Sequence, residues 1–433
     1  MMDTGSSSGE IIGHSKAVNA VAIRHQRPFR AATGGDDATI VFHQGAPYKF
    51  DKTIKTHTKY VQDVKYAPSG DHFASVGSDA KVFLYDGKTG DTLGDVESKK
   101  AVTTWTLGSG VNNQQVGNVW TEGDDIVSLS MSGDLNIFDK RTGDKPARVL
   151  QGPSKPITAA VPASSSGTFI EGVADGRVLA HSGSEYSYLD GPGHTNLVSG
   201  LAVASDGKVF SAGYDDTVRE ITPDVSGFIQ SSFSTASQPK SLAVAGDSTV
   251  FVAEVNVVEA IRSNQKVYDF QPKFTPSAVA ASGSVVAVGG EDQKVRLYDW
   301  DGKVLKEVAV LDNNKGSISA LAFSHDGSLL VAGDSSGKII LYDAKERKMV
   351  NSRWSNHSGR VLSLAWSADG KHCASGSLDT HVYVWSIAKP MKNIAIKNAA
   401  AGSVNAVFWL GETKLGSAGA DGCVRTWDIT FHA

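Results

Sequence analysis

The chain has 433 residues, 40% of them apolar, so it can bury more than one sizeable core, and we expect one to three compact units. A formal net charge of -4 without a run of Lys or Arg gives no electrostatic reason to expect nucleic acid or an anionic membrane as a partner. No apolar run reaches the roughly 18–20 residues of a membrane span, Met1–Glu10 lacks a signal-peptide core, and two cysteines are too few for a disulfide framework. We therefore expect a soluble, intracellular protein.

Short strand-forming runs that follow an Asp/Ser/Gly turn and close on an aromatic residue recur ten times along the chain. Clear copies are GSDAKVFLYD (Gly77–Asp86), GEDQKVRLYD (Gly290–Asp299) and GADGCVRTWD (Gly419–Asp428). The spacing of roughly 40 residues is that of WD40 repeats, each of which forms one four-stranded blade of a β-propeller. Because one ring usually holds about 4–8 blades, the sequence predicts an all-β fold with two rings in tandem.

The first repeats, taken in chain order, form an irregular half. One blade opens at Gly13-His14 and closes in GGDDATIVFHQG, where His43 stands in the usual Trp position, and a second blade runs from His57 to Asp86. The period then breaks, because the residues before Gly94 and those after Asp95 both resemble the exit of a blade. A repeat body of about 30 residues is expected to be absent there, judged against the repeat period.

Another repeat follows this break, so residues 1–150 are predicted to hold three to four blades, one of them truncated near residues 94–95. Such an arc leaves blade faces uncovered, and we expect it to be mobile or prone to aggregation.

The remaining residues, 151–433, contain seven repeats, which is enough for one complete ring. Their turn-plus-strand segments are ADGRVLAHS, YDDTVREIT, AEVNVVEAI, EDQKVRLYD, SSGKIILYD, LDTHVYVWS and ADGCVRTWD. The junction is predicted in Gln151–Lys155, because a Gly-Pro-Ser-Lys-Pro stretch cannot continue a central strand. The predicted fold is therefore a complete seven-bladed C-terminal propeller preceded by an incomplete N-terminal one.

Four polar residues of one repeat, His357, Ser375, Asp379 and Trp385, fit the hydrogen-bonded network of a WD40 blade. A Ser, a His and an Asp would also suit a hydrolase triad. The structural role is favoured, because the same positions recur in repeats where members are missing. A G-x-S-x-G match at Gly333–Gly337 is followed by a strand rather than a helix, and no Cys/His cluster has zinc spacing. We predict no enzyme activity, no catalytic residue, no metal and no cofactor.

The segment GAPYKF (Gly45–Phe50) places two aromatic residues and a Lys on a Pro-initiated connection, and Tyr60 follows soon after. Exposed aromatic residues with a charged rim are typical of interface hot spots. By composition alone, it is an equally good interpretation that Tyr48 and Phe50 cover the sheet edge.

Three runs, Gly13–Phe50, NNQQVGNVW (Asn112–Trp120) and SGSLDTHVYVWSIAKPMKNI (Ser375–Ile394), resemble the actin-interacting protein one family of fungi and animals. The resemblance covers essentially the whole chain. It implies a cytoplasmic double seven-bladed WD40 propeller that works with cofilin to disassemble actin filaments. Against the family's fourteen blades, this chain begins at the fourth and has lost most of the sixth.

The resemblance also implies a contact surface for cofilin-decorated actin at Asp36, Lys49, Phe50 and Tyr60. The loop here reads Ala-Pro-Tyr where the family more often has Pro-Pro-Phe. The expected activity is filament severing or subunit loss together with end capping, by a monomer located at cortical actin structures. The alternative is a general WD40 scaffold that binds short peptides at a propeller face.

Overall fold

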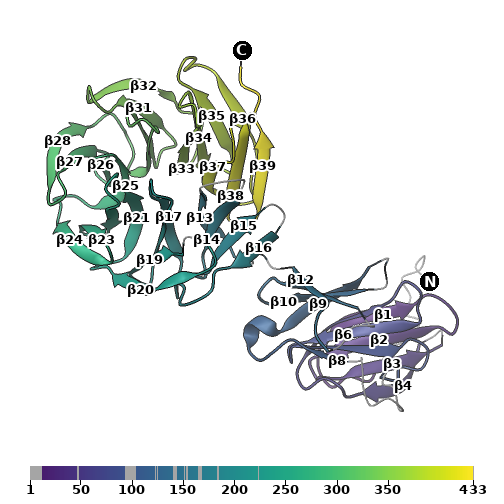
Figure 1. Cartoon of the computed structure of the whole chain (residues 1–433). Helices are drawn as coiled ribbons and strands as arrows, with labels where there is room; N and C mark the ends of the chain where they lie inside the picture. Colours follow the sequence, from purple (N-terminus) through teal and green to yellow (C-terminus); the bar gives the residue numbers. More distant parts are fainter. Residues whose placement is uncertain are drawn as a thin grey trace. The chain divides into compact units, whose positions relative to one another are not determined.

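The computed structural model describes residues 12–45, 48–92, 104–121, 123, 125–139, 144–150, 152, 155–163, 168–182, 185–222 and 224–432. The chain divides into two compact units, Met1–Ser154 and Lys155–Ala433 (Figure 1). Apart from one short 3-10 helix, η1, the regular structure of the described residues consists of antiparallel strands in ten sheets, so the all-β WD40 propeller prediction is confirmed. In the described part of the chain no helix is long and apolar enough to cross a membrane.

The first unit contains three four-stranded sheets, ordered β1-β2-β3-β4, β5-β6-β7-β8 and β9-β10-β11-β12. Its elements are β1 (Val18–Arg24), β2 (Arg30–Gly35), β3 (Ile40–Gln44), β4 (Lys49–Ile54), β5 (Val61–Tyr66), β6 (His72–Gly77), β7 (Lys81–Asp86), β8 (Thr104–Thr106), η1 (Val111–Asn113), β9 (Gln115–Trp120), β10 (Ile126–Ser130), β11 (Leu135–Phe138) and β12 (Arg148–Leu150). The first strand of each blade packs against the first strand of the next, β1 on β5 and β5 on β9.

The predicted break at Gly94–Asp95 lies outside the described residues, but the strands on either side of it belong to one blade. β7 pairs with β8, with Lys81 opposite Thr106 and Phe83 opposite Thr104. Trp105 of β8 is fully buried between Val82 of the same blade and the third blade. The fourth strand of the second blade therefore comes from the residues that follow the break.

The second unit contains seven sheets (Figure 1). Its strands are β13 (Ile157–Pro162), β14 (Thr168–Val173), β15 (Val178–Ser182), β16 (Glu185–Tyr188), β17 (Val198–Val203), β18 (Val209–Gly213), β19 (Thr217–Ile221), β20 (Phe228–Ser234), β21 (Pro239–Val244), β22 (Val250–Glu254), β23 (Val258–Arg262), β24 (Gln265–Phe270), β25 (Pro276–Ser282), β26 (Val285–Gly290), β27 (Val295–Trp300), β28 (Leu305–Leu311), β29 (Ile318–Phe323), β30 (Leu329–Asp334), β31 (Ile339–Asp343), β32 (Lys348–Trp354), β33 (Val361–Trp366), β34 (His372–Ser377), β35 (Val382–Ser386), β36 (Asn393–Ile396), β37 (Val404–Trp409), β38 (Lys414–Gly419) and β39 (Val424–Asp428).

The seven first strands of this unit form a closed circle. Each packs against the next, and the last, β37, packs against the first, β13. At the closure Asn405 Nδ2 donates to the carbonyl of Ile157 at 2.7 Å, which joins residues 248 positions apart. Every blade of the second unit is therefore covered by a neighbour on both faces.

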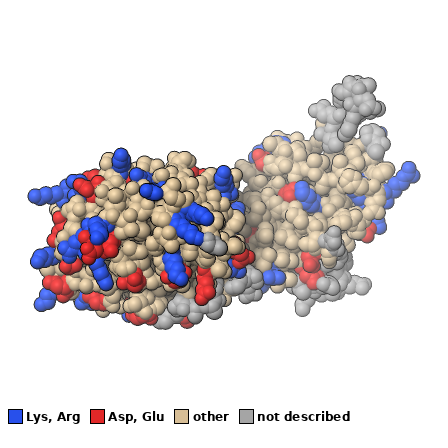
Figure 2. All heavy atoms as spheres, turned by 90° about the horizontal axis from the view of Figure 1, so that it is seen from above, with Lys and Arg blue, Asp and Glu red and all other residues tan. Residues whose placement is uncertain are grey.

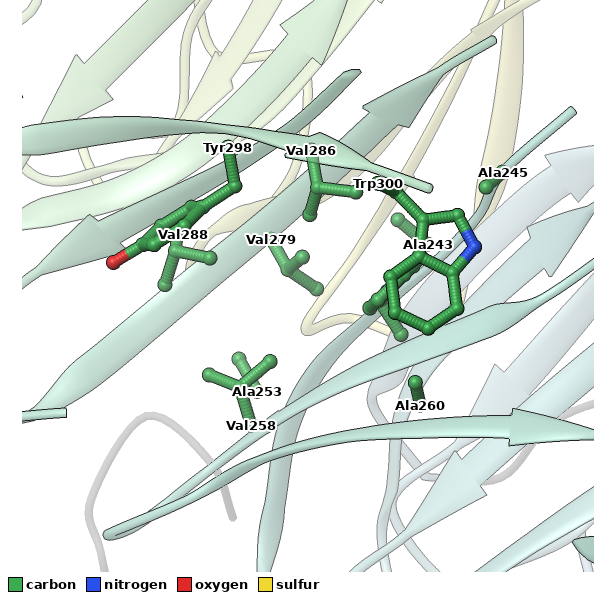
Figure 3. Packing of buried hydrophobic residues seen from close by; sticks show 11 residues of the cluster. Ala243, Ala245, Ala253, Val258, Ala260, Val279, Val286, Val288, Tyr298 and Trp300 are labelled. Carbon is green, nitrogen blue, oxygen red and sulfur yellow. The ribbon is translucent and has the colours of Figure 1, made fainter. Parts of the chain in front are cut away.

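The core of the second unit lies between neighbouring blades rather than within one. Figure 3 shows such a core, in which Ala253 and Val258 of one blade meet Val279, Val286 and Val288 of the next. Neighbouring blades can approach each other closely because a small residue of one blade leaves room for a branched side chain of the next. A Cβ added at Gly376, for example, would lie 2.6 Å from Val404 Cγ1. Apolar residues on both faces of the strands are what this packing requires.

Candidate partner-binding site

The four polar residues of the β33–β36 blade form one connected network. Asp379 contacts His357 Nδ1 at 2.9 Å, His357 Nε2 lies 2.8 Å from Ser375 Oγ, and Trp385 Nε1 donates to the same oxygen at 2.8 Å. Burial alone would raise the pKa of Asp379, but hydrogen bonds from Ser358 and His357 hold this pKa below its ordinary value. Burial lowers the pKa of His357, which favours the neutral imidazole.

Similar networks occur in three other blades, where the Trp position is filled differently. In the second blade the set is His57, Ser75 and Asp79, and Tyr85 takes the place of Trp, with its hydroxyl 3.1 Å from Ser75 Oγ. The blade that begins with β17 has a matching set of three residues, His194, Ser211 and Asp215.

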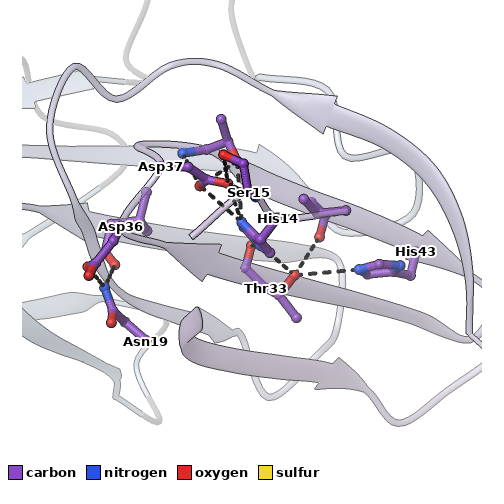
Figure 4. A network of polar contacts seen from close by, with 10 residues as sticks. His14, Ser15, Asn19, Thr33, Asp36, Asp37 and His43 are labelled. Carbon is purple, nitrogen blue, oxygen red and sulfur yellow. Dashed lines mark hydrogen bonds and ion pairs between the residues drawn. The ribbon is translucent and has the colours of Figure 1, made fainter. Parts of the chain in front are cut away.

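The first blade carries the most altered network (Figure 4). His14 lies between Asp37 and Thr33, with its Nδ1 3.0 Å from Asp37 and its Nε2 2.9 Å from Thr33 Oγ1. His43 stands in the Trp position at 3.4 Å from the same Thr33 oxygen, and burial lowers the pKa of its imidazole.

These sets do not form hydrolase triads that a substrate can reach. Ser75, Ser211 and Ser375 are fully buried, and each hydroxyl contacts a His of its own blade. Among the described residues, no group of three or more His, Cys, Asp or Glu side chains could hold a metal ion. The central channel of the second unit, about 650 Å³ in volume, is lined by its seven first strands, and Ser199, Ser277 and Ser319 there donate to backbone carbonyls.

Of the predicted contact residues, Asp36 lies at one end of the first blade, and Tyr60 lies near it at the start of the second blade. Asp36 is in the turn between β2 and β3 and accepts a hydrogen bond from Asn19 Nδ2 at 2.7 Å (Figure 4). Tyr60 directly precedes β5, its side chain is 49% exposed, and its carbonyl accepts from Ser78 N. Asn19 also donates to the carbonyl of Val61, so it links Asp36 to the residue after Tyr60.

Lys49 and Phe50 lie at the opposite end of the first blade from Asp36. They begin β4, where Phe50 is opposite His43, whereas the other end of β4 is marked by Ile54 opposite Ile40. At about 3.3 Å per residue, the two ends of β3 are separated by roughly 13 Å. Phe50 is 50% exposed, while Ala46 and Pro47 of the predicted loop are outside the described residues. The four residues therefore form two pairs rather than one patch.

Charge around these pairs is mixed. Lys52 is paired with Asp91, and Lys65 is paired with Asp63. On the face drawn in Figure 2, basic and acidic side chains are interspersed over both units. Neither sign forms a continuous field there, so recognition by this surface would depend on local contacts rather than on long-range attraction.

Sequence reasoning missed a pair of buried acids in the β21–β24 blade. Glu254 and Glu259 are fully buried, and Glu254 accepts hydrogen bonds from the backbone and hydroxyl of Ser237 at 2.6 and 3.0 Å. Burial, together with sharing of a hydrogen bond with Glu259, raises the pKa of Glu254 to about 8. Glu259 is paired with Lys266 at 3.3 Å. The sequence did contain a signal for this burial. The second strand of this blade, β22, ends in Glu, whereas the second strands of four other blades in the unit end in Gly or Ser.

Comparison with known proteins gives the family. The WD domain, G-beta repeat model matches residues 5–43, 48–86 and 184–220, and the Vps8 beta-propeller model matches residues 266–391. A WD repeat-containing protein of Schizosaccharomyces pombe is 36% identical over 99% of this chain and 78% of its own length.

Two further relatives are similarly close. The 66 kDa stress protein of Physarum polycephalum is 34% identical over 99% of this chain and 78% of its own length. Actin-interacting protein 1 of Drosophila melanogaster is 34% identical over 99% of this chain and 77% of its own length. The latter alignment spans 471 positions, more than the 433 residues of this chain, so the relative holds residues within the aligned region that are absent here. Identity at this level over nearly the whole chain shows that the protein is a member of the actin-interacting protein 1 family of WD40 propellers.

Proposed function

We propose that this protein is a non-enzymatic, actin-interacting WD40 protein of the cytoplasm that acts on filaments carrying cofilin. The relative from Drosophila melanogaster is named for its interaction with actin. Bound to cofilin-decorated filaments at cortical actin structures, the protein would promote severing or subunit loss and cap filament ends. Three residues of the first blade, Asp36, Lys49 and Phe50, and Tyr60 at the start of the second would supply contacts.

The observation that carries this proposal is the exposure of two aromatic side chains, Phe50 of the first blade and Tyr60 at the start of the second, near charged residues. Aromatic residues that become buried on binding supply much of the energy of protein interfaces. Because the two pairs lie toward opposite ends of the first two blades, they suit a partner that extends past them, such as a filament, better than a short peptide.

The alternative, a general peptide-binding scaffold, is not favoured. A peptide would be expected to bind at the mouth of the propeller channel. There the Lys240 ammonium is already held by Glu291 at 3.0 Å and by the carbonyl of Pro276. No exposed aromatic pair comparable to Phe50 and Tyr60 occurs among the described residues of the second unit.

Replacing Phe50 or Tyr60 with alanine is expected to weaken binding to cofilin-decorated actin by 1 kcal/mol or more, roughly fivefold in affinity or greater, because each change removes an exposed aromatic anchor. The measurement is co-sedimentation of the full chain with actin filaments, with and without cofilin, over a range of filament concentrations. The matched control is Tyr186→Ala, which removes a partly exposed aromatic side chain in the second unit.

Binding that persists undiminished in both Phe50→Ala and Tyr60→Ala would contradict this site. Equal binding with and without cofilin would contradict the cofilin dependence while leaving actin binding intact.

A further inference from the structure

Asn19 joins two of the predicted contact residues where the first blade meets the second. Its Nδ2 donates to Asp36 Oδ1 at 2.7 Å (Figure 4). The same nitrogen donates to the carbonyl of Val61, the residue after Tyr60, at 3.0 Å. An asparagine amide carries two N–H donors, so both bonds can form at once. The Asp36 carboxylate and the backbone beside Tyr60 are therefore held by one amide group.

The position of Asn19 in its blade recurs in the second unit. Asn19 lies in a bulge of β1, where the register with β2 shifts. Three residues at the equivalent bulge of other blades each donate to a carbonyl of the next blade, at 2.6 to 2.7 Å: Thr158, Ser319 and Asn405. One donor is enough for this contact between blades. The second donor of Asn19 is therefore available for Asp36.

The charge of the Asp36 carboxylate is not neutralised within the described residues. Asp36 is partly exposed, its printed side-chain bond comes from a neutral amide, and no described Lys or Arg forms an ion pair with it. Glu291 occupies the equivalent position of the β25–β28 blade, since both follow the second strand and donate their N–H to the residue before the first. There the bulge residue is Lys240, which pairs with Glu291 at 3.0 Å. A bulge lysine thus neutralises Glu291, whereas a bulge asparagine leaves Asp36 its charge.

Tyr60 adds an aromatic ring beside this carboxylate. Its side chain is 49% exposed, and it directly precedes the carbonyl that Asn19 holds. Cations bind over the face of a tyrosine ring, and a guanidinium can pair with a carboxylate and stack on an aromatic ring. Because Asn19 fixes Asp36 relative to the backbone at Tyr60, it limits the distance between carboxylate and ring. Such preorganisation lowers the entropy cost of binding.

We propose that Asp36 and Tyr60 bind a basic side chain of the partner, an arginine or a lysine, and that Asn19 is the residue that positions Asp36 for it. This names the partner chemistry of one of the two pairs, so it rests on the proposed function. Oδ1 of Asp36 accepts from Asn19, which leaves Oδ2 for the incoming cation. A basic group suits this place better than an apolar one, because an apolar group would remove the carboxylate from water without replacing its hydrogen bonds.

The test is the affinity of the full chain for cofilin-decorated filaments, measured by co-sedimentation at about 50 and about 300 mM salt. Asp36→Asn keeps an oxygen that can accept from Asn19 but removes the charge, so affinity should fall roughly fivefold at the lower salt and less at the higher. Asn19→Ser can still donate to Val61, as Ser319 donates to the next blade, but it has no second donor for Asp36. This variant should bind roughly threefold more weakly, with an unchanged free energy of unfolding.

A combined variant and a matched control separate positioning from a general effect on the fold. Adding Asn19→Ser to Asp36→Asn should cause no further loss, because Asn19 acts through the Asp36 charge. Asn405→Ser makes the same substitution at the equivalent bulge of the second unit, where the amide donates to a backbone carbonyl, and it should bind like the unchanged chain. Repeating the series with bare filaments assigns the basic group. A loss there as well would place it on actin, and a loss only with cofilin bound would place it on cofilin.

Undiminished binding of Asp36→Asn would overturn the proposal. So would a loss with Asn19→Ser that persists in full in the combined variant, or one that does not change with salt. If Phe50→Ala weakens binding while Asp36→Asn does not, the proposed function stands and this site is wrong. If the full chain binds neither kind of filament, the proposed function fails and this proposal fails with it.

Discussion

Replacing Asp379 with alanine is expected to lower the free energy of unfolding of the second unit by about 3 kcal/mol. The carboxylate accepts from His357 Nδ1, from the Ser358 N–H at 2.8 Å and from the His381 N–H at 3.1 Å. Alanine would leave these donors without their acceptor in a largely buried site. Each such donor costs about 1–3 kcal/mol when it cannot reach water, and partial relaxation of the loop lowers the total.

The measurement is denaturant unfolding of the full chain followed by tryptophan fluorescence, with hydrogen exchange to assign the transition to the blade of β33–β36. Asp428→Ala is the control, because Asp428 is exposed at the end of β39. Asp379→Asn should give an intermediate loss, since the amide oxygen can accept from Ser358 but cannot match the carboxylate. An Asp379→Ala protein as stable as the control would contradict the assignment of this network to the fold.

The repeat architecture could be predicted because its signals are local in sequence. Each blade closes with a turn of Asp, Ser or Gly followed by a strand, and His357, Ser375, Asp379 and Trp385 fall at fixed offsets in one repeat. These offsets determine which residues face each other across one sheet, so a single repeat contains the information for its own hydrogen bonds. The family resemblance had the same basis, and it is confirmed by the relatives.

The layout of the candidate site could not be predicted in the same way. Asp36, Lys49, Phe50 and Tyr60 are near in sequence, but β3 and β4 each reverse the chain direction, so proximity along the chain does not give proximity on the surface. The pairing of β8 with β7 across the break was also missed, because the two strands are separated in the sequence by the irregular segment. Such pairings are decided by tertiary packing and not by local pattern.

The buried acids of the β21–β24 blade show a further limit of sequence reasoning. AEVNVVEAI was recognised as a blade segment, but nothing in that pattern marked Glu254 or Glu259 as buried. Their burial follows from the neighbouring blades, whose packing side chains lie many residues away along the chain. The cost of that burial gives Glu254 a pH dependence that can be tested.

Changing Glu254 to glutamine is expected to stabilise the second unit by about 3 kcal/mol at pH 9 and to leave it nearly unchanged at pH 4. The pKa of Glu254 is raised from 4.5 to about 8 by burial and by the shared hydrogen bond with Glu259. Between these two values the folded chain holds a proton that the unfolded chain has lost. The stability contributed by protonated Glu254 is therefore complete below pH 4.5, falls as pH rises toward 8, and is lost above it.

Glutamine keeps an oxygen for the Ser237 donors and has no proton to lose, so the variant should lack this part of the pH dependence. The measurement is the free energy of unfolding of both proteins at several values between pH 4 and pH 9, with Glu412→Gln as a control at an exposed position. Subtracting the two curves removes the titration of groups that do not contact Glu254, because those groups are common to both proteins. A difference that stays constant with pH would show that Glu254 titrates near its ordinary value, and a destabilised variant at pH 9 would show that the carboxylate form is the one the fold requires.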